Sequence, residues 1–202
     1  MRKYLSSLVA ILCVGLALDS SSVGAQSREP GNSPAGSGAA QAMALGPQQA
    51  ALGEWLGRWD VQIVLSDGSK AAQHSTGNTE CAWVVTGRWL GCRLLAKMLG
   101  FPYEQFTIFG YDSYAKNVVE VAVGSVDNSM LQARGPTPGP NQAVTALFGE
   151  LDEYTTGVLH SPYKVLLRRV SPDRRITTIM GLDVNGNEVK KVEFTFSRSR
   201  AP

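Results

Sequence analysis

The feature that most constrains the fold of this chain is a hydrophobic period of two, which recurs in short segments from Trp59 to Arg198. In the first segment, Trp59, Val61 and Ile63 alternate with polar residues. Such alternation is typical of a β-strand with one face in a core and the other in water. Hydrophobic residues make up 44% of the 202 residues, which is enough for a core and excludes a wholly disordered chain.

Further segments with this pattern follow, and turn-forming residues separate them. They span residues 78–85, 88–98, 104–111, 118–126, 129–134, 143–150, 158–170, 174–183 and 189–198. Gly, Pro, Asp and Asn in the gaps favour tight connections, and no long helical pattern intervenes. We therefore predict an all-β fold, an antiparallel up-and-down barrel of about 8–10 strands that closes to remove its edges. A short N-terminal helix is expected at Pro47 to Leu52, with proline in its first turn.

The N-terminus has the pattern of a secretory signal peptide, which we assign to residues 1–25. Two basic residues precede an apolar run from Leu5 to Leu18, and small residues lie before a cleavage site after Ala25. The alternative is a membrane anchor, but the run is shorter than the ~20 residues that a spanning helix needs.

The rest of the chain is expected to form an exported tail and domain. Residues 26–46, rich in Gly, Ser, Pro and Ala, are expected to form a disordered tail, and residues 47–200 the barrel domain. No other segment is apolar enough to span a bilayer, so we expect a soluble periplasmic or extracellular protein. Nucleic acid is not an expected partner, because 19 Lys and Arg stand against 17 Asp and Glu without a basic run.

Two cysteines are predicted to form a disulfide in that compartment. A tight turn that pairs Val85 with Arg88 sets Cys81 opposite Cys92. Directly paired strand residues have Cα atoms ~4.5–5.5 Å apart, within disulfide reach, and exported domains are oxidised. The alternative is two buried thiols. We expect no metal site, because two cysteines and two distant histidines do not make a ligand set.

The register of the last hairpin follows from its loop length. A three-residue loop from Val184 to Gly186 would set the face that holds Ile176 and Met180 against the face that holds Phe194. A two-residue turn would set the same face against charged residues. The longer loop is therefore predicted, with Gly186 in the left-handed position of a bulge.

Trp59 and Arg198 are predicted to close the barrel. Trp59 begins the first strand and Arg198 ends the last one, each in phase with the apolar face. If these two strands pair antiparallel, both residues lie at the same barrel end. A guanidinium stacked on the indole and donating to helix carbonyls would then seal that end. The alternative is an ordinary surface arginine.

Several short motifs carry a resemblance to a known family. They are Leu52 with Gly57-Arg58-Trp59, then Gly110-Tyr111-Asp112, then Gly149-Glu150 with Asp152 and Thr156-Gly157, and finally Gly186 with Glu193 to Arg198. In this order the chain resembles the lipocalin-like (calycin) barrels and, more narrowly, the bacterial "domain of unknown function 1579" family. The resemblance covers about residues 48–200. It implies a lipocalin-like barrel and no settled activity.

Ligand binding is the function that a barrel of this size favours. Alternate side chains of about ten strands can enclose a cavity for a small apolar or amphipathic ligand. The residues expected to line it are Trp83, Leu90, Leu94, Phe106, Ile108, Met180 and Phe194. The segment from Lys97 to Glu104 is a candidate portal or lid, although it could also only cover a barrel end. No cofactor is expected.

Three other functions stay open. An enzyme of hydrolase or isomerase type could use Tyr111 and Asp112, but Asp112 fits a turn residue, and motifs for a nucleophile elbow or a phosphate loop are missing. A haem-binding barrel would take His160 as ligand, because His74 falls in a polar segment expected to be a solvated loop. The third is an envelope module without a ligand.

Overall fold

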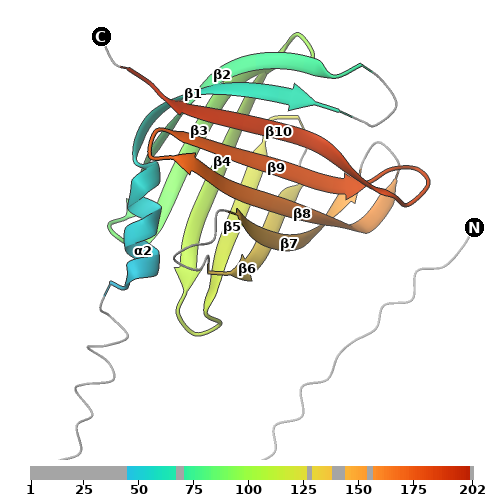
Figure 1. The fold of residues 1–202 in the computed structure, drawn as a ribbon. Coiled ribbons are helices and arrows are strands. Elements are labelled where there is room, and N and C mark those ends of the chain that lie inside the picture. Colours follow the sequence, from blue (N-terminus) through green and yellow to red (C-terminus); the bar gives the residue numbers. More distant parts are fainter. Residues whose placement is uncertain (1–44, 67–70, 127–128, 138–143, 154–156, 201–202) are drawn as a thin grey trace, which may run out of the picture.

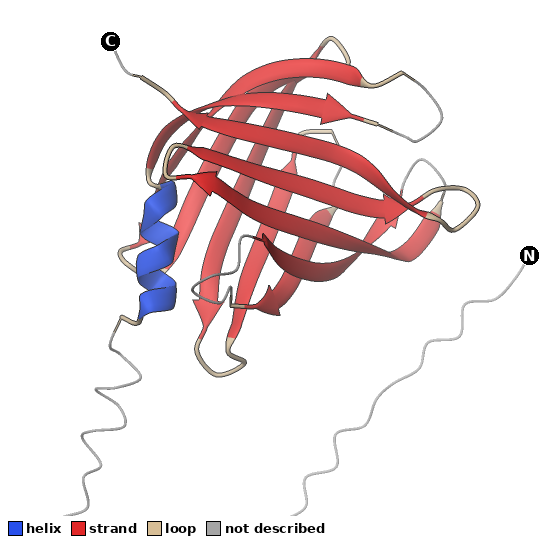
Figure 2. Ribbon diagram, viewed as in Figure 1, coloured by secondary structure: helices blue, strands red, loops and turns tan. Residues whose placement is uncertain are grey.

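The computed structural model describes residues 45–66, 71–126, 129–137, 144–153 and 157–200, which form a closed antiparallel barrel with one short helix (Figures 1 and 2). The predicted signal peptide and nearly all of the predicted tail lie outside these residues. Within the described ranges, the helical segments are too short to cross a bilayer.

The order of elements follows the sequence pattern closely. Helix α2 (Pro47–Leu52) leads into a single 3-10 turn, η1 (Gly53–Trp55). The strands are β1 (Gly57–Leu65), β2 (Gln73–Val85), β3 (Trp89–Met98), β4 (Phe101–Asp112), β5 (Asn117–Gly124), β6 (Met130–Pro136), β7 (Val144–Glu153), β8 (Val158–Ser171), β9 (Arg174–Leu182) and β10 (Glu188–Arg198).

Each strand pairs with its neighbour in sequence, and β1 pairs with both β2 and β10, so the sheet has no free edge. The predicted all-β, up-and-down barrel is confirmed. Trp59 lies directly opposite Arg198 in the β1–β10 ladder. Closure follows from the physical cost of an open edge, which leaves a row of backbone N–H and C=O groups unpaired.

Helix α2 and η1 lie at the barrel end where β1 begins and β10 ends (Figure 1). Pro47 occupies the first helical turn, where a missing backbone N–H costs nothing. Leu52 is buried, and Trp55 packs against the same apolar cluster as Trp59. The helix therefore buries its last turn on the barrel end and carries Trp55 into the interior.

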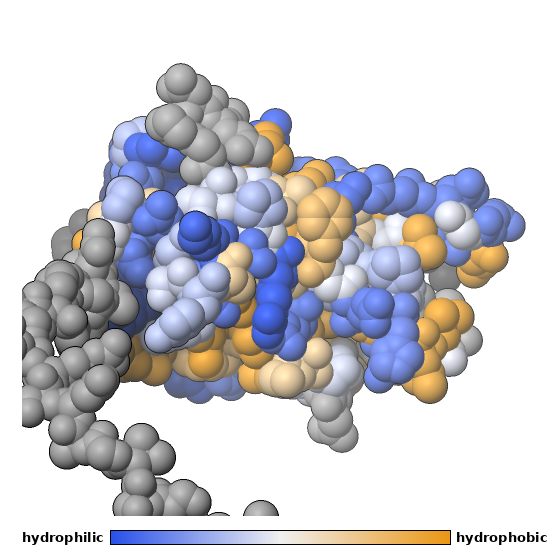
Figure 3. All heavy atoms as spheres, turned by 90° about the horizontal axis from the view of Figure 1, so that it is seen from below, coloured by the Kyte–Doolittle hydropathy of each residue, from blue (hydrophilic) through white to orange (hydrophobic). Residues whose placement is uncertain are grey.

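The inner face of the barrel is mixed in polarity rather than apolar throughout. Its fully buried members include Trp59, Ile63, Leu90 and Leu147. Alternation also brings buried threonines to this face at Thr79, Thr107, Thr145 and Thr177. The outer face in turn carries apolar residues between polar ones (Figure 3). Hydrophobicity alone therefore does not tell the two faces apart on every strand.

The β2–β3 hairpin differs in one pair from the prediction. Cys81 pairs with Cys92 as expected, but Val85 pairs with Trp89 and not with Arg88. A register shift between Trp83 and Val85 lengthens the loop by one residue. The backbone N–H of Arg88 donates to the carbonyl of Val85 at 2.9 Å within this loop.

The last hairpin differs more strongly, and the prediction of its register was wrong. Phe194 pairs with Thr177, so the inner face of β9 holds Thr177 and Ile179 instead of Ile176 and Met180. The loop runs from the end of β9 at Leu182 to Glu188, and the ladder shifts register between Lys190 and Val192. The barrel accepts a threonine inside because the interior is partly polar. Gly186 takes the predicted left-handed conformation, with φ 80°.

Two further segments differ from their predicted structure. Strand β2 begins at Gln73, five residues before the predicted start, because β1 supplies a complete ladder for it. The predicted portal at residues 97–104 is a tight hairpin: β3 ends at Met98 and β4 begins at Phe101. Leu99 and Gly100 both have positive φ, as a two-residue hairpin turn of type I′ requires.

Candidate functional site

The barrel interior holds a cavity of about 40 Å³. By the usual size of one water site, this is space for about three water molecules. The cavity is lined by Trp55, Thr79, Cys81, Cys92, Leu94, Gln105, Thr107, Phe109, Glu120, Thr177, Ile179, Phe194 and Phe196. Its walls therefore combine aromatic rings with a few polar groups, the composition that small-molecule sites in proteins share.

A polar stripe runs along the inner face of β4. The Tyr103 hydroxyl donates to Oε1 of Gln105 at 2.5 Å, and Nε2 of Gln105 donates to Oγ1 of Thr107 at 2.8 Å. These residues are spaced by two, so one strand places all of them inside the barrel. The stripe leads from the β3–β4 hairpin end of the barrel towards Glu120 on the next strand, since Phe109 of β4 pairs with Glu120 of β5.

Glu120 is an acid in the barrel interior. Its Oε2 atom is shielded from solvent and has no hydrogen-bond partner among the described residues. The side chain points into the barrel, and the residue forms part of the cavity wall. Burial disfavours the charged form and raises the pKa of Glu120 from its usual value near 4.5 to about 7. The cavity therefore contains an acid that titrates near neutral pH.

Tyr163 of β8 is the titratable neighbour of Glu120. The residue is buried, and its pKa is raised, first by burial and then by the negative charge of Glu120. Gly149 lies opposite Tyr163, and a Cβ atom there would come within 2.7 Å of the ring. A side chain at position 149 would therefore collide both with the ring and with the backbone carbonyl oxygen of Gln132.

Aromatic rings form the wall of the cavity nearest the helix. Trp55 stacks on Phe109 with 5.9 Å between ring centroids and meets Phe196 edge-on at 5.4 Å. Phe194 stacks on Phe196 at 6.2 Å. The backbone carbonyl of Trp55 accepts a hydrogen bond from Nε1 of Trp59 at 2.8 Å, which fixes this wall to the barrel end.

Behind that wall lies the plug, which we define as Trp55, Trp59, Arg175 and Arg198. The guanidinium of Arg198 lies 4.1 Å from the Trp59 ring centroid and donates to the carbonyls of Leu56 at 2.8 Å and Glu54 at 2.9 Å. The interior of this end is thus closed by cation–π contacts and hydrogen bonds to the helix segment.

Arg175 completes the plug from β9. Its side chain is only 7% exposed and donates to Oε2 of Glu54 at 2.7 Å. The guanidinium also lies 4.8 Å from the Trp55 ring centroid. Burial lowers the pKa of Arg175, and the Glu54 carboxylate opposes that effect. The buried cation is therefore paired, while its Nε atom has no partner among the described residues.

The residues predicted to line a pocket divide into two groups. Trp83, Leu90, Leu94 and Phe194 share the inner face, and Leu94 and Phe194 line the cavity. Leu90 and the half-buried Trp83 belong to the apolar cluster at the helix end. The Cys81–Cys92 disulfide is present and forms part of the cavity wall.

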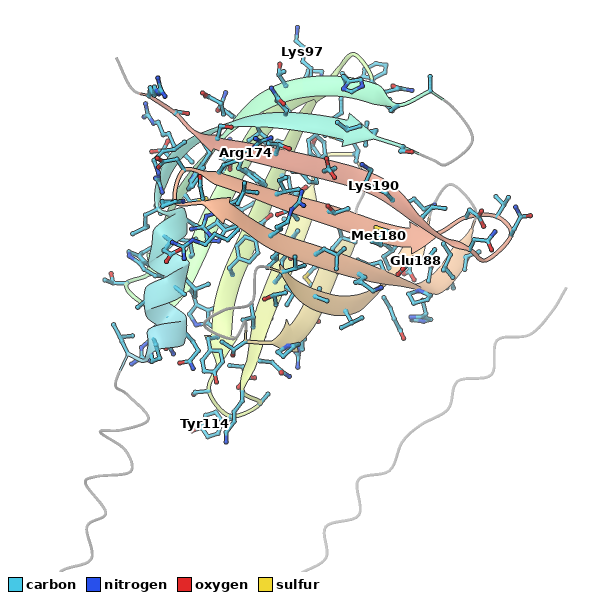
Figure 4. The ribbon with its side chains drawn as sticks, viewed as in Figure 1. Lys97, Tyr114, Arg174, Met180, Glu188 and Lys190 are labelled. Carbon is cyan, nitrogen blue, oxygen red and sulfur yellow. A yellow bond between two sulfur atoms is a disulfide. The ribbon has the colours of Figure 1, made fainter. Side chains whose placement is uncertain are left out.

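Phe106, Ile108 and Met180 lie on the outer face, which corrects the predicted phase of β4 and β9. Phe106 pairs with Arg93, Ile108 pairs with Gly91, and Phe106 is 38% exposed. Met180 pairs with Lys164 and Lys190 on the outside of the sheet (Figure 4). Apolar residues on both faces of β4 made the inner face ambiguous, and the inner face turned out to be the more polar one.

The residues behind the other hypotheses lie apart from the cavity. His160 has a 78% exposed side chain, 3.6 Å from a Glu150 oxygen on the outer surface. His74 lies in β2 opposite Val64 and is exposed, so it is a strand residue rather than a loop residue. The Asp112 carboxylate accepts hydrogen bonds from the backbone N–H groups of Tyr114 and Ala115, as a turn residue does.

Glu120 was missed because a glutamate between valines is typical of a solvent-facing strand position. Counting registers through two hairpins would have found it. Cys92 faces inward opposite Cys81, the turn after Met98 then pairs Cys92 with Thr107, and the turn after Asp112 pairs Phe109 with Glu120. Metal-binding groups of three or more His, Cys, Asp or Glu are not formed by the described residues.

The closed ten-strand barrel with a mixed interior defines a lipocalin-like class of protein. More narrowly, residues 45–198 match the family model described as "Protein of unknown function (DUF1579)". The chain therefore belongs to that family. No curated protein matches it in sequence.

Solved structures share the fold at low sequence identity. One is Rv2717c from M. tuberculosis, with a TM-score of 0.57 and 15% identity over 78% of this chain and 100% of that chain. Another is the S-type phycobiliprotein lyase CPES from Guillardia theta, with a TM-score of 0.51 and 8% identity over 76% of this chain and 93% of that chain. At these identities the likeness extends to the fold alone.

Proposed function

We propose that this protein binds a small amphipathic molecule, or the narrow end of a longer one, in the barrel cavity. The observation that carries the proposal is the composition of the cavity wall. Trp55, Phe109 and Phe196 offer apolar rings, while Thr107 and Glu120 offer polar atoms to the same space. Apolar walls with a few placed polar groups are what orient a small ligand in protein sites.

The size of the cavity limits the ligand. A volume of about 40 Å³ is well below the roughly 300–1,000 Å³ of sites that hold drug-sized molecules. The part of the ligand that enters is therefore a group of few heavy atoms. Its polar end meets the stripe or Glu120, and its carbon atoms meet the rings.

Titration with a neutral probe tests this function. The mature protein is titrated with n-propanol while amide chemical shifts are followed by NMR. Saturable shifts are expected for residues around the cavity, including Trp55 and Thr107. Thr107→Leu, which fills the cavity from a buried inward position, should abolish them. Absence of saturable shifts in the wild type, or unchanged binding in Thr107→Leu, would overturn the proposal.

Export is the second part of the proposed function. The pattern of residues 1–25 predicts a signal peptide, and the Cys81–Cys92 disulfide is compatible with an oxidising compartment. Expression of the full chain in a Gram-negative host should yield a periplasmic protein whose first residue is Gln26. A cytoplasmic product that still begins at Met1 would contradict export.

A further inference from the structure

We propose that the cavity selects ligands that carry a protonated amine, which donates its N–H groups to the carboxylate of Glu120. This inference rests on the proposed function, because it names the chemical class that the same cavity takes. It starts from Glu120, a residue of the cavity wall whose Oε2 atom is shielded from solvent and has no hydrogen-bond partner among the described residues.

Among the described residues around Glu120, none carries a positive charge that could pair with its carboxylate. Its directly paired neighbours are Phe109 on β4 and Ala133 on β6, and every other described residue of the cavity wall is neutral. Tyr163 on β8 is the titratable group within reach of its charge, and it carries no positive charge in either form.

The two inward arginines are already engaged elsewhere. Arg175 is paired with Glu54, and Arg198 donates to two backbone carbonyls and stacks on Trp59. A buried carboxylate without a cation raises the free energy of the folded protein. A ligand that brings a positive charge to the carboxylate would therefore bind with a favourable electrostatic contribution. Water would offer weaker, uncharged donors.

The rings beside Glu120 suit the rest of such a ligand. Phe109 pairs directly with Glu120 and stacks on Trp55, so an alkyl group next to the ammonium would contact apolar surface. Aromatic faces also attract a cation. Trp55 already accepts the guanidinium of Arg175, at 4.8 Å from its ring centroid. The geometry therefore favours a short alkylammonium over an alcohol of the same length.

Ligand binding should then depend on pH with a defined sign. An alkylammonium, with a pKa of roughly 10, stays protonated across the neutral range. The carboxyl group, with a pKa of about 7, must be ionised to accept it. Affinity for the amine should be highest above pH 7 and fall by about tenfold for each unit below it. Tyr163, whose pKa is raised, stays neutral over this range and adds no second step.

The experiment compares n-propylammonium with n-propanol, two probes of equal length. Both are titrated into the mature wild type, Glu120→Gln and Glu150→Gln, with NMR shifts as the readout. Glu150→Gln makes the same charge change on the outer surface, where the side chain is 66% exposed. At pH 8 we expect the wild type and Glu150→Gln to bind propylammonium at least about tenfold more tightly than propanol. Glu120→Gln should lose this preference, so that it binds the two probes with about equal affinity.

The outcomes separate this inference from the proposed function. If propanol binds and propylammonium binds no more tightly, the amine inference is wrong and the proposed function stands. The same holds if Glu120→Gln keeps the preference. If propanol does not bind to the wild type, the proposed function fails and the inference fails with it. The pH dependence of the wild type gives a second test that needs no variant: affinity for propylammonium that does not change between pH 5.5 and 8 would overturn the inference.

Discussion

The plug and the cavity both bury charge, and they treat it in opposite ways. In the plug, Arg175 is paired with Glu54, and Arg198 donates to Leu56 and Glu54 carbonyls. In the cavity, Oε2 of Glu120 has no partner among the described residues. Pairing offsets the cost of burying a charge, so a paired charge can hold parts of a structure together. A buried charge without a partner raises the free energy of the folded state. The contrast supports our proposal that the cavity binds a ligand, while the plug stabilises the barrel.

The largest effect is expected from the plug. Trp59→Ala removes a fully buried ring and should lower the free energy of unfolding by about 3–5 kcal/mol. Urea denaturation measures this loss. Val84→Ala, at an exposed position, is the control and should change stability by less than about 0.5 kcal/mol. A loss below about 1 kcal/mol for Trp59→Ala would show that the plug does not support the barrel.

Removal of the charge in the cavity should raise stability, whereas the substitution in the plug lowers it. The pKa of Glu120 is raised from its usual value near 4.5 to about 7, so the folded state holds its proton more tightly than the unfolded state. Stability is therefore unaffected by this group below about pH 4.5, falls as the pH rises to about 7, and stays lowered above that.

Glu120→Gln removes this penalty. Because the pKa difference corresponds to about 3 kcal/mol, the variant should be more stable than the wild type by up to that amount at pH 8 and equally stable near pH 4. Denaturation at both pH values measures it. A variant that is less stable at pH 8 would mean that Glu120 has a partner in the folded protein, and the contrast with the plug would disappear.

The Cys81–Cys92 disulfide joins two strands of the cavity wall. Its sequence separation is 11, so the entropy of a short closed loop gives a contribution of about 2–3 kcal/mol. The double variant Cys81→Ser and Cys92→Ser should lower the free energy of unfolding by that amount. Reductant should lower the melting temperature of the wild type but not of the variant. A titration that finds two free thiols in the unreduced protein would contradict the bridge.

The smallest change in stability is expected from the ion pair between Glu54 and Arg175 in the plug. Glu54→Gln replaces the carboxylate that accepts from buried Arg175 and should cost about 2 kcal/mol, the value of a charge-assisted hydrogen bond. Asp173→Asn, which alters the exposed ion pair with Arg198, is the matched control and should cost well under about 1 kcal/mol. Equal effects in a denaturant series would mean that burial of the pair contributes nothing.

Most of the fold could be predicted because strand period and turn residues are local. The closing pair of Trp59 and Arg198 needed only the phase of the first and last strands. The pairing of Cys81 with Cys92 survived an error at Val85, because the register shift lies on the loop side of that pair. Strand phase was harder on β4, where Phe106 and Ile108 lie outside and Thr107 lies inside.

The candidate site was only partly accessible from the sequence. Leu94 and Phe194 were found because their strands have one clearly apolar face. Met180 was misplaced because the more apolar face of β9 was assigned to the interior. The register shift between Lys190 and Val192 brings Thr177 and Ile179 inward instead, and a shift of one residue exchanges the two faces of a strand. Glu120 needed the registers of two hairpins in succession, and an error in either would have turned it outward.

By itself, the sequence determined the alternation, the turns and therefore an antiparallel barrel with a tryptophan and an arginine at one end. These properties depend on neighbours within a few residues or on a single pairing. Only the tertiary structure decided that Glu120 faces a cavity while Arg175 meets Glu54, because both depend on the summed registers of many strands around a closed sheet.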